Sequence, residues 1–447
     1  MGMAAFVSKR FIPYNRHRYR CAMKILWVCS LPLPQMAAQL QINQSSFGGW
    51  LIGLSRQLAK ESSVSLSVLA NVPDDTGEVD GTVDAYEYYT FTGLSNRQTE
   101  VSQKRIRRFQ DVLQKSQPDV IHIFGTEYAF TQEMVMAAER EHCLERVVIS
   151  LQGLMGEYAS HYSDGLDRSI IYHQTVRERI RGQSIFQDQQ LFFMRSRFEE
   201  YALRHVSHVI GRTDWDHQFA RTMNPDIQYH YCSETLRPEF YGYQWENTAC
   251  RKHTIFISQA SYPIKGFHLF LKAMPVLTQR FSDLQVYVTG RDLVHLSMKE
   301  KFHLDSYRLY LHQLIRQLHL EGYLTFCGTL DAEQMRDHLL SANAFVSPSV
   351  LENSSNSIGE AMLVGTPVIA SDTGGTCSMI PDSSCGLLYP LLDTDALIEA
   401  VSSVFSDPHQ CQTLSKGEKR RAAQLFDPAV NQKQLLSIYQ SIAQEEK

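Results

Sequence analysis

Residues 350–365 read Val-Leu-Glu-Asn-Ser-Ser-Asn-Ser-Ile-Gly-Glu-Ala-Met-Leu-Val-Gly and lie between the apolar runs 344–348 and 367–371. Asn356 or Ser357 can cap the N-terminus of a helix that continues to about residue 364. A glycine at 365 suits the position after the last helical turn. The stretch therefore predicts strand, loop, helix and strand in succession, which is the repeating unit of a parallel α/β sheet.

The start of this helix is suited to bind an anion. The first N–H groups of a helix have no partner inside it, so those of Asn356, Ser357 and Ile358 can face a diphosphate at the carboxyl end of the preceding strand. Glu360 would then reach ribose hydroxyls, and Glu352 a sugar attached to the diphosphate. A plainer interpretation stays open, in which Glu360 completes a capping box and Glu352 is an exposed loop acid.

Outward from this stretch, short apolar runs alternate with segments of helical period over most of the chain. This alternation predicts two Rossmann-like, doubly wound parallel-sheet domains of α/β class that face each other across a cleft. We expect a first series of strands at 24–30, 65–70, 86–91, 120–124, 147–151, 206–211 and 229–233, and a second series at 254–258, 284–289, 323–328, 344–348, 367–371 and 386–389.

An aperiodic, aromatic stretch at 237–250 separates the two series. The expected domains are residues 23–245 and residues 246–425. Residues 1–22 read as a disordered basic tail, and residues 426–447 as a helix that returns toward the first domain. Within the first domain, the polar segment 169–204 predicts one or two additional helices.

The composition excludes several classes of protein. A formal charge of −5 gives no global attraction to nucleic acid. Nine scattered cysteines without a CxxC pair favour a reducing compartment over a disulfide framework or zinc ribbon. No run reaches the roughly 20 apolar residues that a membrane-spanning helix needs. We therefore expect a cytoplasmic protein, either free or peripheral at the inner face of the plasma membrane.

The spacing of Glu352 and Glu360 resembles the E-x7-E motif of retaining glycosyltransferases with the GT-B fold, in particular the GT4 family. The following Gly-Thr-Pro-Val-Ile-Ala-Ser at 365–371 and the glycine pair at 374–375 also match, and the similarity extends over most of the chain from residue 23. The resemblance implies a first domain that binds an acceptor and a second that binds a nucleotide-sugar donor. It also implies transfer of a hexose-type sugar in the synthesis of a bacterial capsule or other surface polysaccharide.

The same resemblance implies the catalytic residues. A family lysine that grips the donor diphosphate matches Lys265, but the companion arginine five positions earlier is replaced by Ala260. We expect Arg212, which follows the strand 206–211, to supply the missing cation. Gln152 stands where many members carry a histidine, and it can hydrogen-bond sugar hydroxyls although it cannot titrate. His161 is the alternative for an acid or base role.

Two further donor contacts are expected. Gly48 and Gly49 precede a helix after the first strand and resemble the family's glycine-rich loop, which lets the backbone approach the donor. An ordinary turn is the alternative reading. The loops near Gly290 and at 327–328 are the places where the nucleotide base would bind.

Lys104, Arg105, Arg107 and Arg108 lie on an expected helix of the first domain. They could meet anionic lipid headgroups at the inner membrane, where a lipid-linked acceptor would be found. A solvated helix face is the alternative.

We expect neither an essential metal nor a cofactor besides the nucleotide-sugar substrate, because the Asp-x-Asp patterns at 214–216 and 393–395 read as helix caps. Other functions stay open at this point. The fold would also suit a nucleotide-sugar epimerase or a sugar phosphorylase. The departures at Gln152 and Ala260 would fit a catalytically silent nucleotide-sugar-binding subunit.

Overall fold

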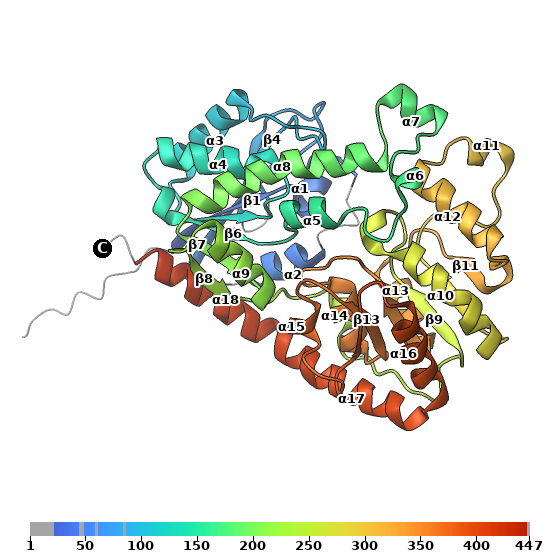
Figure 1. The fold of residues 1–447 in the computed structure, drawn as a ribbon. Helices are drawn as coiled ribbons and strands as arrows, with labels where there is room; N and C mark the ends of the chain where they lie inside the picture. Colours follow the sequence, from blue (N-terminus) through green and yellow to red (C-terminus); the bar gives the residue numbers. More distant parts are fainter. Residues whose placement is uncertain (1–21, 44–48, 59–60, 84–85, 445–447) are drawn as a thin grey trace, which may run out of the picture.

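The computed structural model describes residues 22–43, 49–58, 61–83 and 86–444, which form two α/β domains (Figure 1). The strands of the first domain are β1 (Met23–Cys29), β2 (Val64–Asn71), β3 (Asp80–Val83), β4 (Tyr86–Phe91), β5 (Val120–Phe124), β6 (Val147–Ser150), β7 (His208–Gly211) and β8 (Gln228–Tyr231). Those of the second are β9 (Thr254–Ile257), β10 (Gln285–Val288), β11 (Leu324–Phe326), β12 (Ala344–Ser347), β13 (Val368–Asp372) and β14 (Leu387–Pro390).

Both sheets are of the doubly wound type. The eight-stranded sheet has the order β3-β4-β2-β1-β5-β6-β7-β8, and the six-stranded sheet the order β11-β10-β9-β12-β13-β14. Every expected strand is present within a few residues. The short edge strand β3 was missed, because four residues with a single buried side chain leave little pattern. It is also the one named strand that pairs antiparallel to its neighbour.

The strand order locates the ligand sites. In the first sheet the direction of winding reverses between β1 and β5, and in the second between β9 and β12. Open α/β sheets bind ligands at the carboxyl ends of the strands at such a switch point. The loops that follow β9 and β12 are the ones that carry Lys265 and Glu352.

Helices cover both faces of each sheet. In the first domain they are α1 (Pro34–Gln39), α2 (Gly49–Leu58), α3 (Gln103–Ser116), α4 (Ala129–Arg140), α5 (Met155–His161), α6 (Arg168–Ile171), α7 (Val176–Arg181), α8 (Ile185–His205) and α9 (Asp214–Met223). In the second they are α10 (Phe267–Arg280), α11 (Met298–Lys301), α12 (Ser306–Gln317), α13 (Ala332–Ser341), α14 (Asn356–Val364), α15 (Thr376–Met379), α16 (Thr394–Ser406) and α17 (Pro408–Leu425), followed by α18 (Pro428–Ile442).

The additional helices of the first domain differ from expectation. Three helices, α6, α7 and α8, occupy the segment in which one or two were expected. They also touch both domains, since Ile185 of α8 belongs to the hydrophobic core of the second domain, Ile170 of α6 packs against that core, and Arg177 of α7 donates to the carbonyl of His303. The segment therefore bridges the domains instead of decorating the first one.

The basic segment on α3 does not present all four expected side chains to solvent, and the prediction is wrong for Arg105 and Arg108. Arg105 is buried and binds Glu133 of α4 through two nitrogens, at 2.6 and 2.8 Å. Arg108 is buried and pairs with Asp80 of β3. Lys104 pairs with Glu78 at 2.9 Å, so Arg107 is the one of the four for which no ion pair is recorded in the described chain. Two arginines point inward because the missed strand and α4 supply their counter-ions.

Helix α18 crosses back and packs on the first sheet. Trp27 of β1 donates through Nε1 to the Tyr439 hydroxyl at 3.0 Å, and that hydroxyl lies 2.6 Å from Nδ1 of His122 on β5. The other ring nitrogen of His122 is 2.7 Å from the hydroxyl of Ser150. Burial lowers the pKa of His122 to about 3, so the ring is neutral. Tyr439 therefore donates to Nδ1, and Nε2 carries the proton toward Ser150.

Replacing Tyr439 by phenylalanine tests this connection. The change leaves the buried Trp27 N–H and His122 Nδ1 without partners, so we expect the free energy of unfolding to fall by about 1–3 kcal/mol. Tyr172→Phe is the control, because that ring is 60% exposed. Denaturant unfolding of both variants measures the difference. An equal stability of Tyr439→Phe and the unchanged protein would contradict the assigned network.

Candidate active site

Two loops meet at the switch point of the second sheet. A 3-10 turn at Pro263–Lys265 follows β9, and residues 348–355 follow β12. The backbone N–H of Val350 donates to the carbonyl of Ile264 at 2.7 Å. Gly266 has a φ of 63°, and a Cβ there would lie 1.7 Å from the carbonyl oxygen of Pro348. No side chain fits between the loops, so their close approach requires glycine at this position.

This approach brings Lys265 and Glu352 together. Nζ of Lys265 donates to Oε1 of Glu352 at 2.6 Å, and the side chains are 17% and 9% exposed. The Ser349 hydroxyl donates to the same carboxylate oxygen at 2.7 Å. Burial favours the neutral amine, but the Glu352 carboxylate outweighs it and raises the pKa of Lys265 well above its usual value. The structure therefore holds a charged ammonium beside a carboxylate at the carboxyl ends of β9 and β12.

The start of α14 lies directly after this loop. Its N-cap is Ser355, one residue before the first predicted candidate, and no side chain within the described chain caps it. Asn356, Ser357 and Ile358 form its first turn. The predicted capping box with Glu360 is absent from this helix. The N–H groups of the first turn are therefore left for a ligand or for water.

Glu360 instead binds an arginine of the interdomain segment. Nε and Nη2 of Arg237 lie 2.6 and 2.8 Å from its two carboxylate oxygens. Burial raises the pKa of Glu360, and Arg237 opposes that rise. Since a carboxylate has about four lone-pair sites and this contact uses two, Glu360 keeps capacity to accept from hydroxyl groups.

Asn353 connects this loop to the first domain. Its buried amide accepts from the Thr213 hydroxyl at 2.8 Å and donates to the backbone carbonyl of Gln152 at 3.1 Å. It also donates to Asp216 of α9 at 3.0 Å. Gly374, whose added Cβ would lie 2.2 Å from the Glu352 carbonyl, packs against the same loop from β13. The residue next to Glu352 is thus hydrogen-bonded across the domain boundary.

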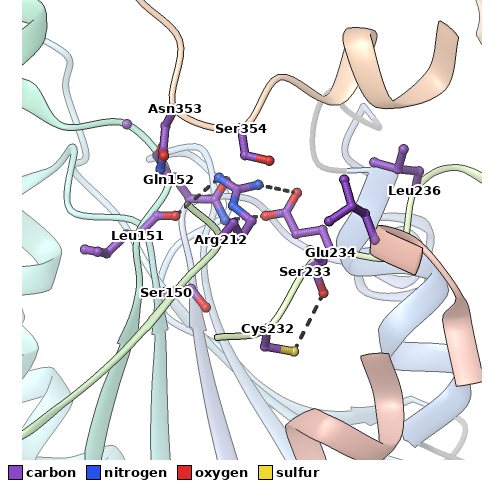
Figure 2. A network of polar contacts seen from close by, with 12 residues as sticks. Ser150, Leu151, Gln152, Arg212, Cys232, Ser233, Glu234, Leu236, Asn353 and Ser354 are labelled. Carbon is purple, nitrogen blue, oxygen red and sulfur yellow. Dashed lines mark hydrogen bonds and ion pairs between the residues drawn. The ribbon is translucent and has the colours of Figure 1, made fainter. Parts of the chain in front are cut away.

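Arg212 and Gln152 lie together on the other side of that boundary, and both contact Glu234 (Figure 2). Nη1 of Arg212 is 3.0 Å from Oε2 of Glu234, and Nε2 of Gln152 donates to Oε1 at 2.5 Å. Nη2 of Arg212 donates to the Leu151 carbonyl at 3.3 Å, whereas its buried Nε has no partner within the described chain. Figure 2 shows Asn353 and Ser354 on the loop that faces this cluster.

A cavity of about 430 Å³ borders Arg212. Its lining includes Asp214 and Tyr231 from the first domain and Ser378 and Arg421 from the second. Lys265 and Glu352 do not line it. Arg212 therefore borders a space between the domains, and Asn353, which donates to the Gln152 carbonyl, directly follows Glu352 in the chain.

The other predicted site residues belong to separate elements, and none of the contacts recorded for them within the described chain involves Lys265 or Glu352. Gly48 lies outside the described residues, and Gly49 is the first residue of α2. Gly290 pairs with Gly328 through two backbone hydrogen bonds at the end of β10, and a Cβ there would meet open space. His161 hydrogen-bonds Asp164 at 2.8 Å in the turn after α5.

Both Asp-x-Asp patterns are helix caps, as expected. Asp216 and Thr213 form a capping box at the start of α9, and Asp393 accepts from the N–H of Ala396 at the start of α16. Among the described residues, no cluster of three or more His, Cys, Asp or Glu side chains could hold a metal. None of the helices that the structure describes has the length and apolarity needed to cross a bilayer.

Sequence reasoning missed four side chains of this region: Glu234, Arg237, Asn353 and Tyr158. Tyr158 of α5 lies close enough to Glu352 and Lys265 for both charges to act on its hydroxyl. Burial is the largest cause that raises the pKa of Tyr158, and the negative charge of Glu352 is the next. Glu234 directly follows the expected strand 229–233, and Arg237 begins the aperiodic stretch 237–250, so no pattern marked either residue. The signal that could have indicated them is charge itself, because charged residues in a short interdomain segment often meet buried partners.

Residues 246–421 match the family model described as glycosyl transferases group 1. The phosphatidyl-myo-inositol mannosyltransferase of Mycolicibacterium smegmatis is 26% identical over 194 residues, which are 42% of this chain and 45% of that protein. The chain thus spans about half the length of the relatives that it matches.

The solved structures extend the likeness to both domains. Sucrose-phosphate synthase of Thermosynechococcus elongatus superposes with a TM-score of 0.67 at 17% identity, covering 94% of this chain and 99% of that one. Anabaena HepE in complex with UDP superposes with a TM-score of 0.61 at 17% identity, covering 94% and 100%. At a sequence identity of 17%, the likeness to these two structures shows the fold alone. Residues 246–421 are thus similar to the glycosyl transferases group 1 family, and the described part of the chain has the two-domain GT-B fold.

Proposed function

We propose that the protein is a retaining glycosyltransferase that moves a hexose-type sugar from a nucleotide-sugar donor to a saccharide or lipid-linked saccharide acceptor. The observation that carries this proposal is the Lys265–Glu352 contact of 2.6 Å at the switch point, beside the uncapped start of α14. A cation and a row of free N–H groups suit a diphosphate. A carboxylate at the same place suits the hydroxyls of the sugar that follows.

The proposed donor contacts extend outward from this centre. The diphosphate binds Lys265 and the N–H groups of Asn356, Ser357 and Ile358, and the sugar binds Glu352. Glu360 accepts from the ribose, and the open space beside Gly290 receives the base. HepE, which shares the fold, was solved with UDP, and this supports a nucleoside diphosphate as the leaving group. The glycine-rich loop at Gly48 and Gly49 would approach the same phosphates.

The proposed reaction breaks the bond between the anomeric carbon and the diphosphate oxygen. Lys265 and Arg212 stabilise the negative charge that develops on that oxygen. The acceptor hydroxyl attacks from the same face of the sugar, and its proton passes to the departing diphosphate. Gln152 and Glu352 hold sugar hydroxyls in place. No covalent intermediate with the protein is required, and no metal enters this scheme.

The acceptor is proposed from the relatives. The mycobacterial relative is named for a phosphatidyl-myo-inositol acceptor, which supports a lipid-linked acceptor here. The E-x7-E segment resembles enzymes of capsule and exopolysaccharide synthesis, and we place the activity in bacterial surface-polysaccharide assembly at the cytoplasmic side of the membrane.

A thermal-shift panel of nucleotide sugars tests donor binding. We expect one nucleotide to raise the melting temperature, because a ligand that binds only the native state stabilises it by RT ln(1 + [L]/Kd). Turnover of the stabilising donor is then measured with and without a saccharide acceptor pool. Transfer that depends on the acceptor supports the proposal. Equal turnover without acceptor would indicate an epimerase, and binding without any turnover a silent subunit.

Replacing Lys265 by alanine tests the role of its ammonium. Removing a group that meets charge developing in the transition state should lower kcat about 100-fold or more. Glu352→Gln should also reduce transfer, because it removes the partner of Lys265 and one sugar contact. Lys433→Ala, on the exposed face of α18, is the matched control. Wild-type kcat in Lys265→Ala, with a normal melting temperature, would refute the assignment.

A double-mutant cycle tests whether Glu234 positions Arg212. If Arg212 acts only while Glu234 holds it, then Glu234→Gln and Arg212→Gln should each lower kcat more than they raise the donor KM. The double variant should be little worse than either single one, because contacting residues are not additive. Losses that simply multiply would show that the two side chains act independently.

A further inference from the structure

Large apolar side chains are exposed at one end of the molecule. Six of the eleven that the described chain exposes belong to the segment from α6 to α8 or to α11 and its C-cap. Four of them form what we call the apolar rim: Val176 and Ile180 on α7, and Met298 and Phe302 at α11. Their exposed fractions are 76%, 81%, 70% and 72%. Soluble surfaces rarely gather so many large apolar groups without a partner.

The short helix α7 is capped at both ends. Thr175 and Glu178 form a capping box at the start of α7, and Gly182 ends it in the left-handed conformation. Val176 and Ile180 are four residues apart, so they share one face of the helix. In Figure 1, α7 projects from the body of the first domain near α6 and α11. The exposed fractions of the four rim side chains show that these side chains project into solvent.

Direct contacts join the two halves of the rim across the domains. Arg177 of α7 donates to the carbonyl of His303 at 2.8 Å. The buried Glu178 accepts from the backbone N–H and the hydroxyl of Ser306, at 2.9 and 3.0 Å. These bonds fix α7 beside the segment between α11 and α12, so the two helices that carry the four apolar side chains are held together.

Basic side chains lie on the two helices of the rim and on α6. Arg168, Arg179, Arg181 and Lys299 are exposed. Lys301 is partly exposed. The acids counted in the same way are the exposed Asp167 and Glu300 and the partly exposed Asp305, and Glu300 is held in a capping box by Ser297. The surface is therefore locally cationic, although the whole chain has a formal charge of −5.

We propose that the apolar rim and its basic border bind the surface of an anionic lipid bilayer. The protruding apolar side chains enter the interface between headgroups and acyl chains, and the arginines and lysines meet the lipid phosphates. A second copy of the chain fits less well, because a two-fold contact would oppose like charges. A protein partner fits less well because hot spots lie in pockets, whereas these side chains project. This surface does not include the α3 segment.

Sedimentation with vesicles tests the proposal independently of any transferase activity. We expect the protein to bind vesicles of phosphatidylcholine and phosphatidylglycerol in about equal amounts, and to bind phosphatidylcholine alone far more weakly. Val176→Ser/Ile180→Ser should weaken binding at least about tenfold, because two large apolar side chains no longer enter the interface. Arg179→Gln/Arg181→Gln should weaken it about tenfold or more and reduce its sensitivity to salt.

Val430→Ser is the matched control, because Val430 is 58% exposed but lies on α18, away from the rim. The exposed positions of all changed side chains predict unchanged melting temperatures. Sedimentation of Val176→Ser/Ile180→Ser equal to that of the unchanged protein would overturn the proposal, as would equal binding to neutral and anionic vesicles. A dimer that this variant converts to a monomer would assign the rim to contact between copies instead.

Discussion

The close approach of two loops at the carboxyl ends of β9 and β12 is the constraint on which the candidate active site depends. Gly266 lets the turn after β9 pass the carbonyl of Pro348, where any Cβ would collide. Gly374 lets the segment after β13 press on the carbonyl of Glu352 from the other side. Held between these contacts, the loop before α14 can present Glu352 to Lys265 at 2.6 Å. The glycines thus allow the two loops to approach closely, and this approach places the charged side chains of Lys265 and Glu352 in contact.

The charged groups of this region pair with one another. Glu352 is bound to Lys265, Glu360 to Arg237, and Arg212 to Glu234. Removing a charge from water is costly unless a partner compensates it, so such pairing is expected of buried side chains. A donor must therefore offer at least equivalent contacts when it takes one partner of a pair. A diphosphate does so for Lys265, since it replaces one anion by another.

The sequence allowed most of the fold to be predicted, because apolar runs of buried parallel strands and the helix signals between them are local. The same holds for Lys265, Glu352 and the first turn of α14, which lie at strand ends in a recognisable motif. Contacts between distant segments were not predictable in this way. The pairing of Arg105 with Glu133 and that of Arg237 with Glu360 depend on tertiary packing, and no local pattern indicates them. The edge strand β3 was too short to be recognised, and the burial of Arg108 against its Asp80 could not be predicted for that reason.

A crystal structure with a bound nucleoside diphosphate tests the central claim most directly. The account predicts phosphate oxygens within hydrogen-bond distance of Nζ of Lys265 and of the N–H groups of Asn356 to Ile358, with the ribose at Glu360. A diphosphate bound instead in the cavity between Arg212 and Arg421, with the Lys265–Glu352 contact unchanged, would contradict it.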